Sequence, residues 1–152
     1  MDTTNTIIGV VITLCCGIPF FLLYVSKKKK TQQKTKFFKT IAEEKLLTIT
    51  KIDVFNHLTF GIDTTKKVAL ITNNSNYEII DLTTCESAFI DIQKKRINKT
   101  VEQITDVFLI FKNTNNNTID FNLFNEDINR LIDGEVEVGQ KWTNTINQCI
   151  KQ

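Results

Sequence analysis

The stretch HLTFGIDTTKKVALITNNSNYEIIDL, residues 57–82, decides the fold of this 152-residue chain. In its first part the apolar residues Leu58, Phe60 and Ile62 alternate with less apolar ones. This period is typical of a β-strand, because successive side chains point to opposite faces of a sheet. Thr64-Thr65 and the NNSN at 73–76 follow as turn-forming segments. The stretch therefore predicts three antiparallel strands: HLTFGID (57–63), KKVALIT (66–72) and YEIIDL (77–82).

Similar segments occur on both sides of this stretch. LLTITKID precedes it at 46–53, and three further alternating segments follow it, separated by loops such as NTNNN at 113–117. Seven short strands at close spacing favour an antiparallel sandwich or barrel. The three later strands are predicted over 85–93, 103–112 and 118–124.

The period changes near the carboxyl end, in EVEVGQKWTNTINQCIKQ. Val138, Trp142 and Ile146 are spaced by four residues, which predicts one apolar stripe on an amphipathic helix. Gly134 marks a break before this helix. We expect the helix to cover the open end of the sheet structure, with Trp142 as its main anchor.

The amino-terminal part contains a long apolar run, IIGVVITLCCGIPFFLLYV at 7–25. It has no charged residue, and twelve of its nineteen residues are Leu, Ile, Val or Phe. As a helix it is about 28 Å long, close to the thickness of a bilayer core, so a transmembrane helix is predicted. A buried core helix and a cleaved signal peptide are the alternatives. The first rarely lacks a polar face, and the second needs positive charge before the run rather than after it.

A basic segment, SKKKKTQQKTK at 26–36, follows the apolar run and predicts a solvated juxtamembrane linker. Residues 27–39 contain seven Lys and no acidic residue. By the positive-inside rule, residues 1–6 are expected outside the cell and residues 37–152 in the cytoplasm, beneath the inner membrane. Phe37 and Phe38 are predicted to open the water-soluble domain, in a short helix.

Charge and chemistry-bearing residues exclude several functions. Residues 40–152 hold 12 Lys or Arg against 16 Asp or Glu, which argues against nucleic-acid binding. His57 is the single histidine, and no Cys-x-x-Cys occurs, so neither a metal nor a cofactor is expected. No catalytic motif is present, and a non-enzymatic protein is predicted. Five carboxylates are interpreted as solvated polar positions of the strands or strand ends: Asp63, Asp81, Asp91, Asp106 and Asp120. Cys85 and Cys149 are interpreted as small core residues.

Seven alternating strands followed by a helix with Trp142 resemble the pleckstrin-homology-like (PH-like) fold. FGIDTTKKVALI at 60–71 and IIDL at 79–82 are similar to a hairpin and a strand of small bacterial proteins of this kind. The resemblance implies an α+β class: an N-terminal transmembrane helix plus a seven-stranded antiparallel PH-like sandwich or barrel, closed by a C-terminal amphipathic helix. Such domains are mostly binding modules. Some bind phosphoinositides through basic residues in the first loop, but DVFNH at 53–57 has none.

The predicted function is that of a single-pass membrane protein whose cytoplasmic domain recruits a protein partner through an exposed strand edge. The sequence does not identify the strand that forms this edge. Binding or sensing of anionic lipid is the alternative, and activity of the span itself is another. Small residues at 13, 16 and 17 leave self-association through the helix open. The predicted membrane-surface contacts are Lys27, Lys28, Lys29, Lys30, Lys34, Lys36, Lys94, Lys95, Arg96 and Lys99.

Overall fold

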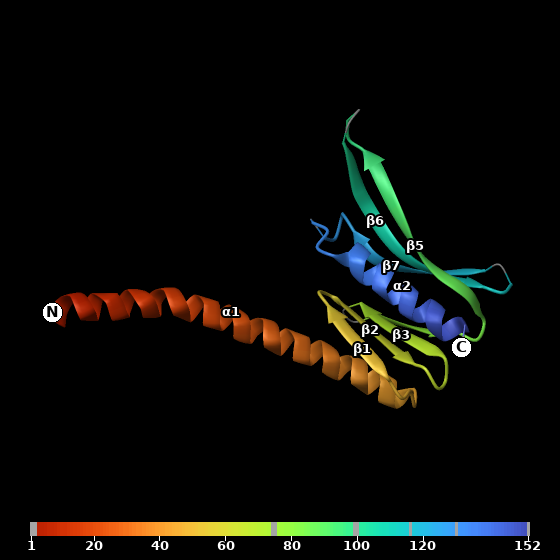
Figure 1. Cartoon of the computed structure of the whole chain (residues 1–152), viewed down its shortest axis with the longest axis horizontal. Coiled ribbons are helices and arrows are strands. Elements are labelled where there is room, and N and C mark those ends of the chain that lie inside the picture. Colours follow the sequence, from red (N-terminus) through yellow and green to blue (C-terminus); the bar gives the residue numbers. More distant parts are fainter. Residues whose placement is uncertain (1–2, 74–75, 99–100, 116, 130, 152) are drawn as a thin grey trace.

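The computed structural model describes residues 3–73, 76–98, 101–115, 117–129 and 131–151, without the side chains of residues 3–17, 19 and 20. Two helices flank two antiparallel sheets, ordered β1-β2-β3-β4 and β5-β6-β7 (Figure 1). The helices are α1 (Thr3–Glu44) and α2 (Glu135–Lys151). The strands are β1 (Lys51–Phe55), β2 (Leu58–Asp63), β3 (Val68–Asn73), β4 (Asn76–Asp81), β5 (Cys85–Arg96), β6 (Glu102–Asn113) and β7 (Thr118–Asn125).

The fold class predicted from the sequence is wrong in its architecture. The chain is α+β, but its strands form a four-stranded and a three-stranded sheet, and neither sheet closes. The break falls after Asp81, whose carboxylate accepts the N–H of Thr83 at 2.9 Å and its hydroxyl at 2.6 Å. These bonds stabilise a sharp turn and lower the pKa of Asp81, the hydroxyl bond most strongly. The turn leads β5 into a second sheet, where it pairs with β6 instead of β4.

The predicted transmembrane helix is also wrong. Within the part of the chain that the structure describes, no helix is long and apolar enough to cross a membrane. Most side chains of the run at 7–25 lie outside that part. Those described, Ile18 and residues 21–25, form only a short apolar segment before the basic one begins. The predictions of a single-pass protein, of an inner-membrane location and of an external amino terminus are corrected with it.

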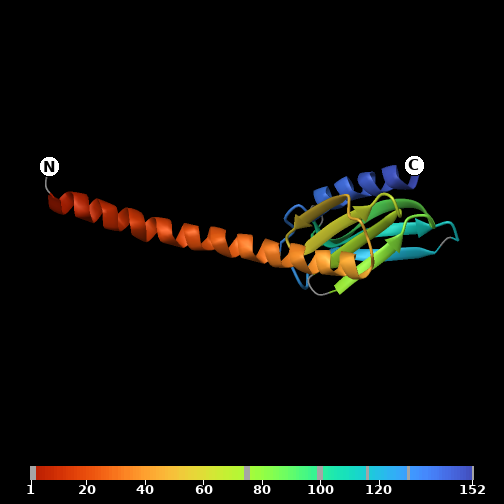
Figure 2. The same ribbon diagram turned by 90° about the horizontal axis from the view of Figure 1, so that it is seen from below.

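Helix α1 is continuous through the segment that was predicted as a solvated linker. It runs for 42 residues, and its last turns lie against the first sheet (Figure 2). Phe38, Ile41 and Ala42 are buried there together with Leu70 of β3, whereas Phe37 is 40% exposed. Phe38 is thus part of a core, whereas Phe37 is not.

Gly61 of β2 makes this contact possible. A Cβ atom added to it would lie 2.4 Å from Cζ of Phe38 and 3.1 Å from Cγ2 of Ile49. Both distances are shorter than ordinary van der Waals contacts, so any side chain here would push the Phe38 ring away. A residue without a side chain therefore fixes where α1 meets the sheet.

Helix α1 ends at Glu44, and Leu46, two residues beyond its end, is a non-glycine residue with a positive φ of 54°. The N–H of Leu47 donates to the carbonyl of Ala42 at 2.8 Å, and the N–H of Leu46 to that of Glu43 at 3.0 Å. These two bonds form a Schellman motif, in which the left-handed position is usually glycine. The side chain of Leu46 is 77% exposed, so it contributes little burial in return.

We expect Leu46→Gly to raise the free energy of unfolding by about 1 kcal/mol, because glycine adopts this φ without the steric cost that a side chain meets. Urea denaturation of the full chain measures the change. Leu46→Ala is the matched control, since it removes the same exposed side chain but keeps the Cβ atom, and it should give no gain. A Leu46→Gly variant no more stable than Leu46→Ala would contradict the explanation.

The main core lies between the two sheets and α2. Phe60 and Ile71 of the first sheet pack with Leu109 and Phe111 of the second, and all four are buried. As predicted, α2 adds Trp142, whose ring stacks on that of Phe60 with centroids 5.3 Å apart. Cys85 and Cys149 are buried in this core, which confirms their interpretation, and burial raises the pKa of both thiols.

Candidate functional site

Four strands lie at the edges of the two sheets, and three of them have neighbours beyond their own sheet. Both helices contact β1, α2 through the ion pair of Lys141 with Asp53. On β5, the side-chain amide of Asn147 in α2 exchanges two hydrogen bonds of 2.8 Å with the N–H and carbonyl of Ala88. On β7, Nε2 of His57 lies 3.2 Å from the carbonyl oxygen of Leu123. These contacts hinder the pairing of another strand with three of the four edges.

Among the described residues, strand β4 shows no such contact, and we call it the open edge. It pairs with β3 alone in the strand order, and five of its six residues are exposed. The N–H of Leu82 donates to the carbonyl of Lys67 at 2.8 Å, which sets the phase of the β3–β4 ladder. Backbone groups alternate in direction along an antiparallel pair, so the N–H and C=O of Tyr77 and Ile79 point away from β3. Four backbone groups are therefore available to an added strand.

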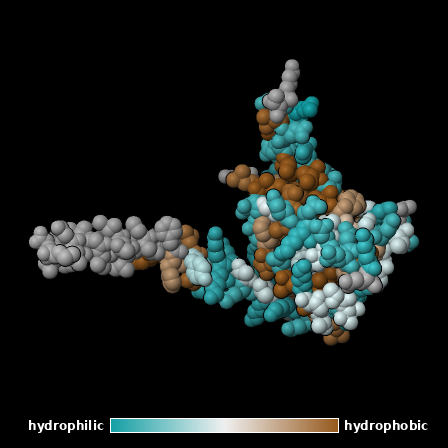
Figure 3. Space-filling model, viewed as in Figure 1, coloured by the Kyte–Doolittle hydropathy of each residue, from teal (hydrophilic) through white to brown (hydrophobic). Residues whose placement is uncertain are grey.

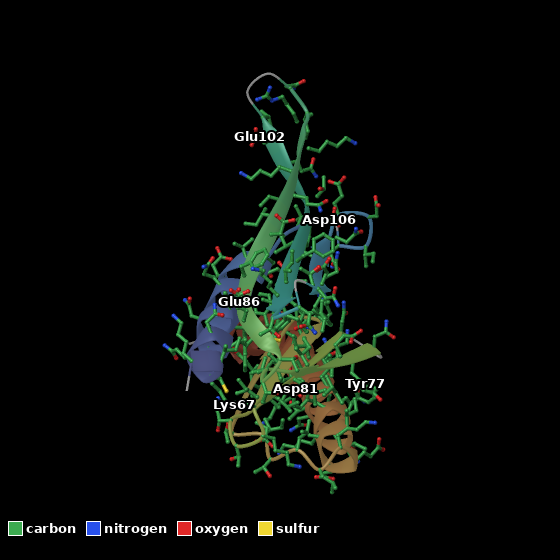
Figure 4. The ribbon with its side chains drawn as sticks, turned by 90° about the vertical axis from the view of Figure 1, so that its right-hand side faces the viewer. Lys67, Tyr77, Asp81, Glu86, Glu102 and Asp106 are labelled. Carbon is green, nitrogen blue, oxygen red and sulfur yellow. The ribbon has the colours of Figure 1, made fainter. Side chains whose placement is uncertain are left out.

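The side chains of Tyr77 and Ile79 face the side of the sheet that α1 covers. Ile79 is opposite Leu70, which packs under α1, and Tyr77 is opposite Thr72 on the same face. They are 43% and 37% exposed. Figure 4 shows Tyr77 and Asp81 at the two ends of the strand. With Glu78, Asp81 makes the strand acidic, and β4 contains no Lys or Arg.

An amide-lined pocket of about 260 Å³ lies at the start of β4. Its walls come from the turn between β1 and β2, from the β3–β4 hairpin, from β7 and from the loop after β7. Among the residues that the structure describes, no side chain that lines it is charged. We call it the amide pocket, and its lining residues are His57, Asn73, Asn76, Asn122, Asn125, Ile128 and Asn129.

The hydrogen bonds of the amide pocket leave several of its polar groups available. Asn125 is committed, because its Nδ2 donates to Asp106 at 2.7 Å and its Oδ1 accepts the N–H of Asp127 at 3.0 Å. Nε2 of His57 faces a carbonyl and so donates, and in the neutral imidazole the Nδ1 atom is then an acceptor. Asn76 and Asn122 make no side-chain hydrogen bond to another described residue. The pocket thus offers neutral donors and acceptors together.

The predicted basic contacts do not form one surface. Lys27, Lys28, Lys29, Lys30, Lys34 and Lys36 lie on α1. Most of them are exposed, but Nζ of Lys34 donates to the carbonyl of Asn56, and burial followed by the charge of Lys30 lowers its pKa. Figures 1 and 3 show this segment and the β5–β6 hairpin as separate projections, and hydrophobic atoms lie among the hydrophilic ones on the hairpin.

The second basic group was predicted in a loop but lies in β5, with the exception of Lys99, which is outside the described residues. Lys94, Lys95 and Arg96 pair with residues of β6 near the tip of the hairpin. Glu102 lies 3.8 Å from both Lys94 and Arg96, so it offsets part of their charge. The group is therefore less basic in the fold than in the sequence.

No protein-family model, no curated protein and no solved structure matches the sequence. In the described residues, no group of three or more His, Cys, Asp or Glu side chains is placed to hold a metal ion. A function is therefore inferred from the geometry of β4 and of the amide pocket.

Proposed function

We propose that the chain is a non-enzymatic, PH-like interaction module that recruits a protein partner by adding an extended segment of that partner to β4. Seven strands followed by a C-terminal helix is the element order expected of the PH-like resemblance, and this order supports that part of the proposal. The open edge at Tyr77 and Ile79 is the observation that supports the addition of a partner strand to β4. Addition of a strand to such an edge is a common mode of peptide recognition.

The energetics favour a modest, reversible affinity. Each backbone hydrogen bond to the four outward groups contributes about 0.5–1.5 kcal/mol net. Tyr77 and Ile79 bury further apolar area when a strand covers them. The cost of association offsets much of this gain, so a dissociation constant on the order of micromolar is expected. Glu78 and Asp81 favour a segment that carries Lys or Arg.

Anionic-lipid binding, the alternative function, has less support. It needs the α1 lysines and the Lys94–Arg96 group to meet one surface, yet they lie on separate projections. Glu102 also offsets charge at the hairpin. Strand addition does not require two distant groups to contact one surface, because the four backbone groups lie within three consecutive residues of β4.

The test is a selection of random peptides displayed on phage against the full chain, followed by binding measurements with Ile79→Pro. Proline removes the outward N–H and leaves the bonds to β3, which come from Ile80 and Glu78, so the edge is blocked without loss of the sheet. We expect selected peptides to bind Ile79→Pro at least about tenfold more weakly than Ile79→Val, the matched control. Peptides that bind both variants equally would contradict the proposal, provided that both unfold at similar temperatures.

A further inference from the structure

We infer that the amide pocket selects an uncharged amide side chain, asparagine or glutamine, in the segment that β4 receives. The inference rests on the proposed function, because it concerns the specificity of the same edge. Its starting point is the position of the pocket. Asn76 is the first residue of β4 and also lines the pocket, so the open edge and the cavity meet at this residue.

The sheet geometry places one side chain of an added strand at the pocket. Asn76 precedes Tyr77, so its side chain lies on the face opposite to that of Tyr77. On this face Asn76 is directly across from Asn73 of β3, and both line the pocket. An added strand continues this row, which brings one of its residues about 5 Å from Asn76. Asn122 of β7 lines the other wall.

The lining selects by hydrogen bonding rather than by charge. The amides of Asn76 and Asn122 each offer two donors and an acceptor oxygen, and Nδ1 of a neutral His57 is one more acceptor. A carboxylate or an ammonium group entering here would lose water, and none of the described lining side chains carries an opposite charge. An aliphatic side chain would leave the amides of Asn76 and Asn122 without partners. A primary amide both donates and accepts, so it satisfies the lining from either side.

The β7 wall offers a way to test the pocket without changing β4. Asn122 is half-buried and pairs with Phe108 across the second sheet, so its substitution leaves the outward groups of Tyr77 and Ile79 in place. Asn122→Leu removes the amide at similar size, and Asn122→Arg adds a positive charge. Asn115→Leu, in the loop at the far end of the β6–β7 hairpin, is the matched control.

The same random library is selected against the full-length parent chain and against these three variants. With the parent and with Asn115→Leu, we expect asparagine or glutamine to be enriched about tenfold at one position of the aligned peptides. Asn122→Leu should abolish this enrichment, and Asn122→Arg should replace it with aspartate or glutamate. A thermal unfolding curve identifies any variant that is not folded, in which case Asn122→Ser replaces it.

The possible results separate this inference from the proposed function. Peptides that require the β4 edge but show no preference for an amide would overturn the inference and leave strand addition intact. Enrichment that survives Asn122→Leu would also overturn it, because the pocket would not be its cause. A selection in which no peptide is sensitive to Ile79→Pro would overturn both.

Discussion

Asp63→Asn is expected to lower the free energy of unfolding by about 2–4 kcal/mol, one of the two largest effects that the structure predicts for a single substitution. The carboxylate of Asp63 is fully buried at the end of β2. Its Oδ2 accepts the N–H of Thr48 at 2.7 Å, and its Oδ1 accepts those of Thr65 and Lys66 at 3.0 and 2.9 Å. Asparagine keeps one acceptor oxygen but turns an NH₂ group toward a backbone N–H. One of these buried donors is then left without a partner.

The same carboxylate predicts a loss of stability in acid. Burial by itself raises the pKa of Asp63, but the N–H groups of Lys66, Thr48 and Thr65 and the charge of Lys66 outweigh it, so the pKa is lowered. A carboxyl group with a lowered folded-state pKa stabilises the fold fully above its unfolded value of about 3.9. This stabilisation is lost as the pH falls below that value, through the folded-state pKa.

Urea unfolding at pH 7 and at pH 3 tests both statements. The parent chain should lose more stability between the two values than Asp63→Asn, because the variant no longer has this titration. Asp120→Asn, at an exposed position of β7, is the matched control and should behave like the parent. Equal losses in the parent and in Asp63→Asn would show that the buried carboxylate does not carry the effect.

Trp142→Ala is expected to lower the free energy of unfolding by about 3–5 kcal/mol. The Trp142 side chain is 1% exposed, stacks on Phe60 and joins α2 to the core between the sheets. Loss of this anchor loosens α2 and with it the Asn147 side chain that covers Ala88 of β5. A second open edge then appears, so we expect the variant to aggregate more readily as well. Thermal unfolding and light scattering measure the two effects.

Trp142→Phe is the control for this substitution. The indole N–H of Trp142 has no hydrogen-bond acceptor in the described part of the chain. Phenylalanine removes that buried donor while it retains an aromatic ring against Phe60, so the loss should be only about 1–2 kcal/mol. If Trp142→Phe were as unstable as Trp142→Ala, packing against Phe60 would not be the source of the stability.

Local patterns in the sequence predicted the strands better than their assembly. Alternation located β2 and the two later hairpins because it depends on residues that are neighbours in the chain. The division into two sheets depends on the turn after Asp81, and alternation contains no information about such a turn. Asp63 shows the same limit: at a strand end it suggested a solvated carboxylate, whereas the backbone of the α1–β1 connection covers it.

The candidate site was less predictable than the strands. An exposed edge was expected, but its identity depends on which strands the helices and His57 contact, and these contacts join residues far apart in the chain. The residues that line the amide pocket come from four separate segments. In the sequence, Asn73 and Asn76 were explained by their preference for turns, so nothing marked them as pocket residues. Their concentration near predicted turns was the one available signal.

The continuous helix between the amino-terminal part and Phe38 also has a mechanical consequence. A 42-residue helix is about 63 Å long, and its last turns are locked to β2 through Gly61 and Phe38. Such a helix transmits rotation. Each residue inserted between Lys28 and Thr35 turns the sheets by about 100° about the helix axis. An insertion of seven residues, about two turns, nearly restores the original orientation of the sheets. The direction in which β4 faces, relative to anything attached near the amino terminus, is therefore set by the number of residues in α1.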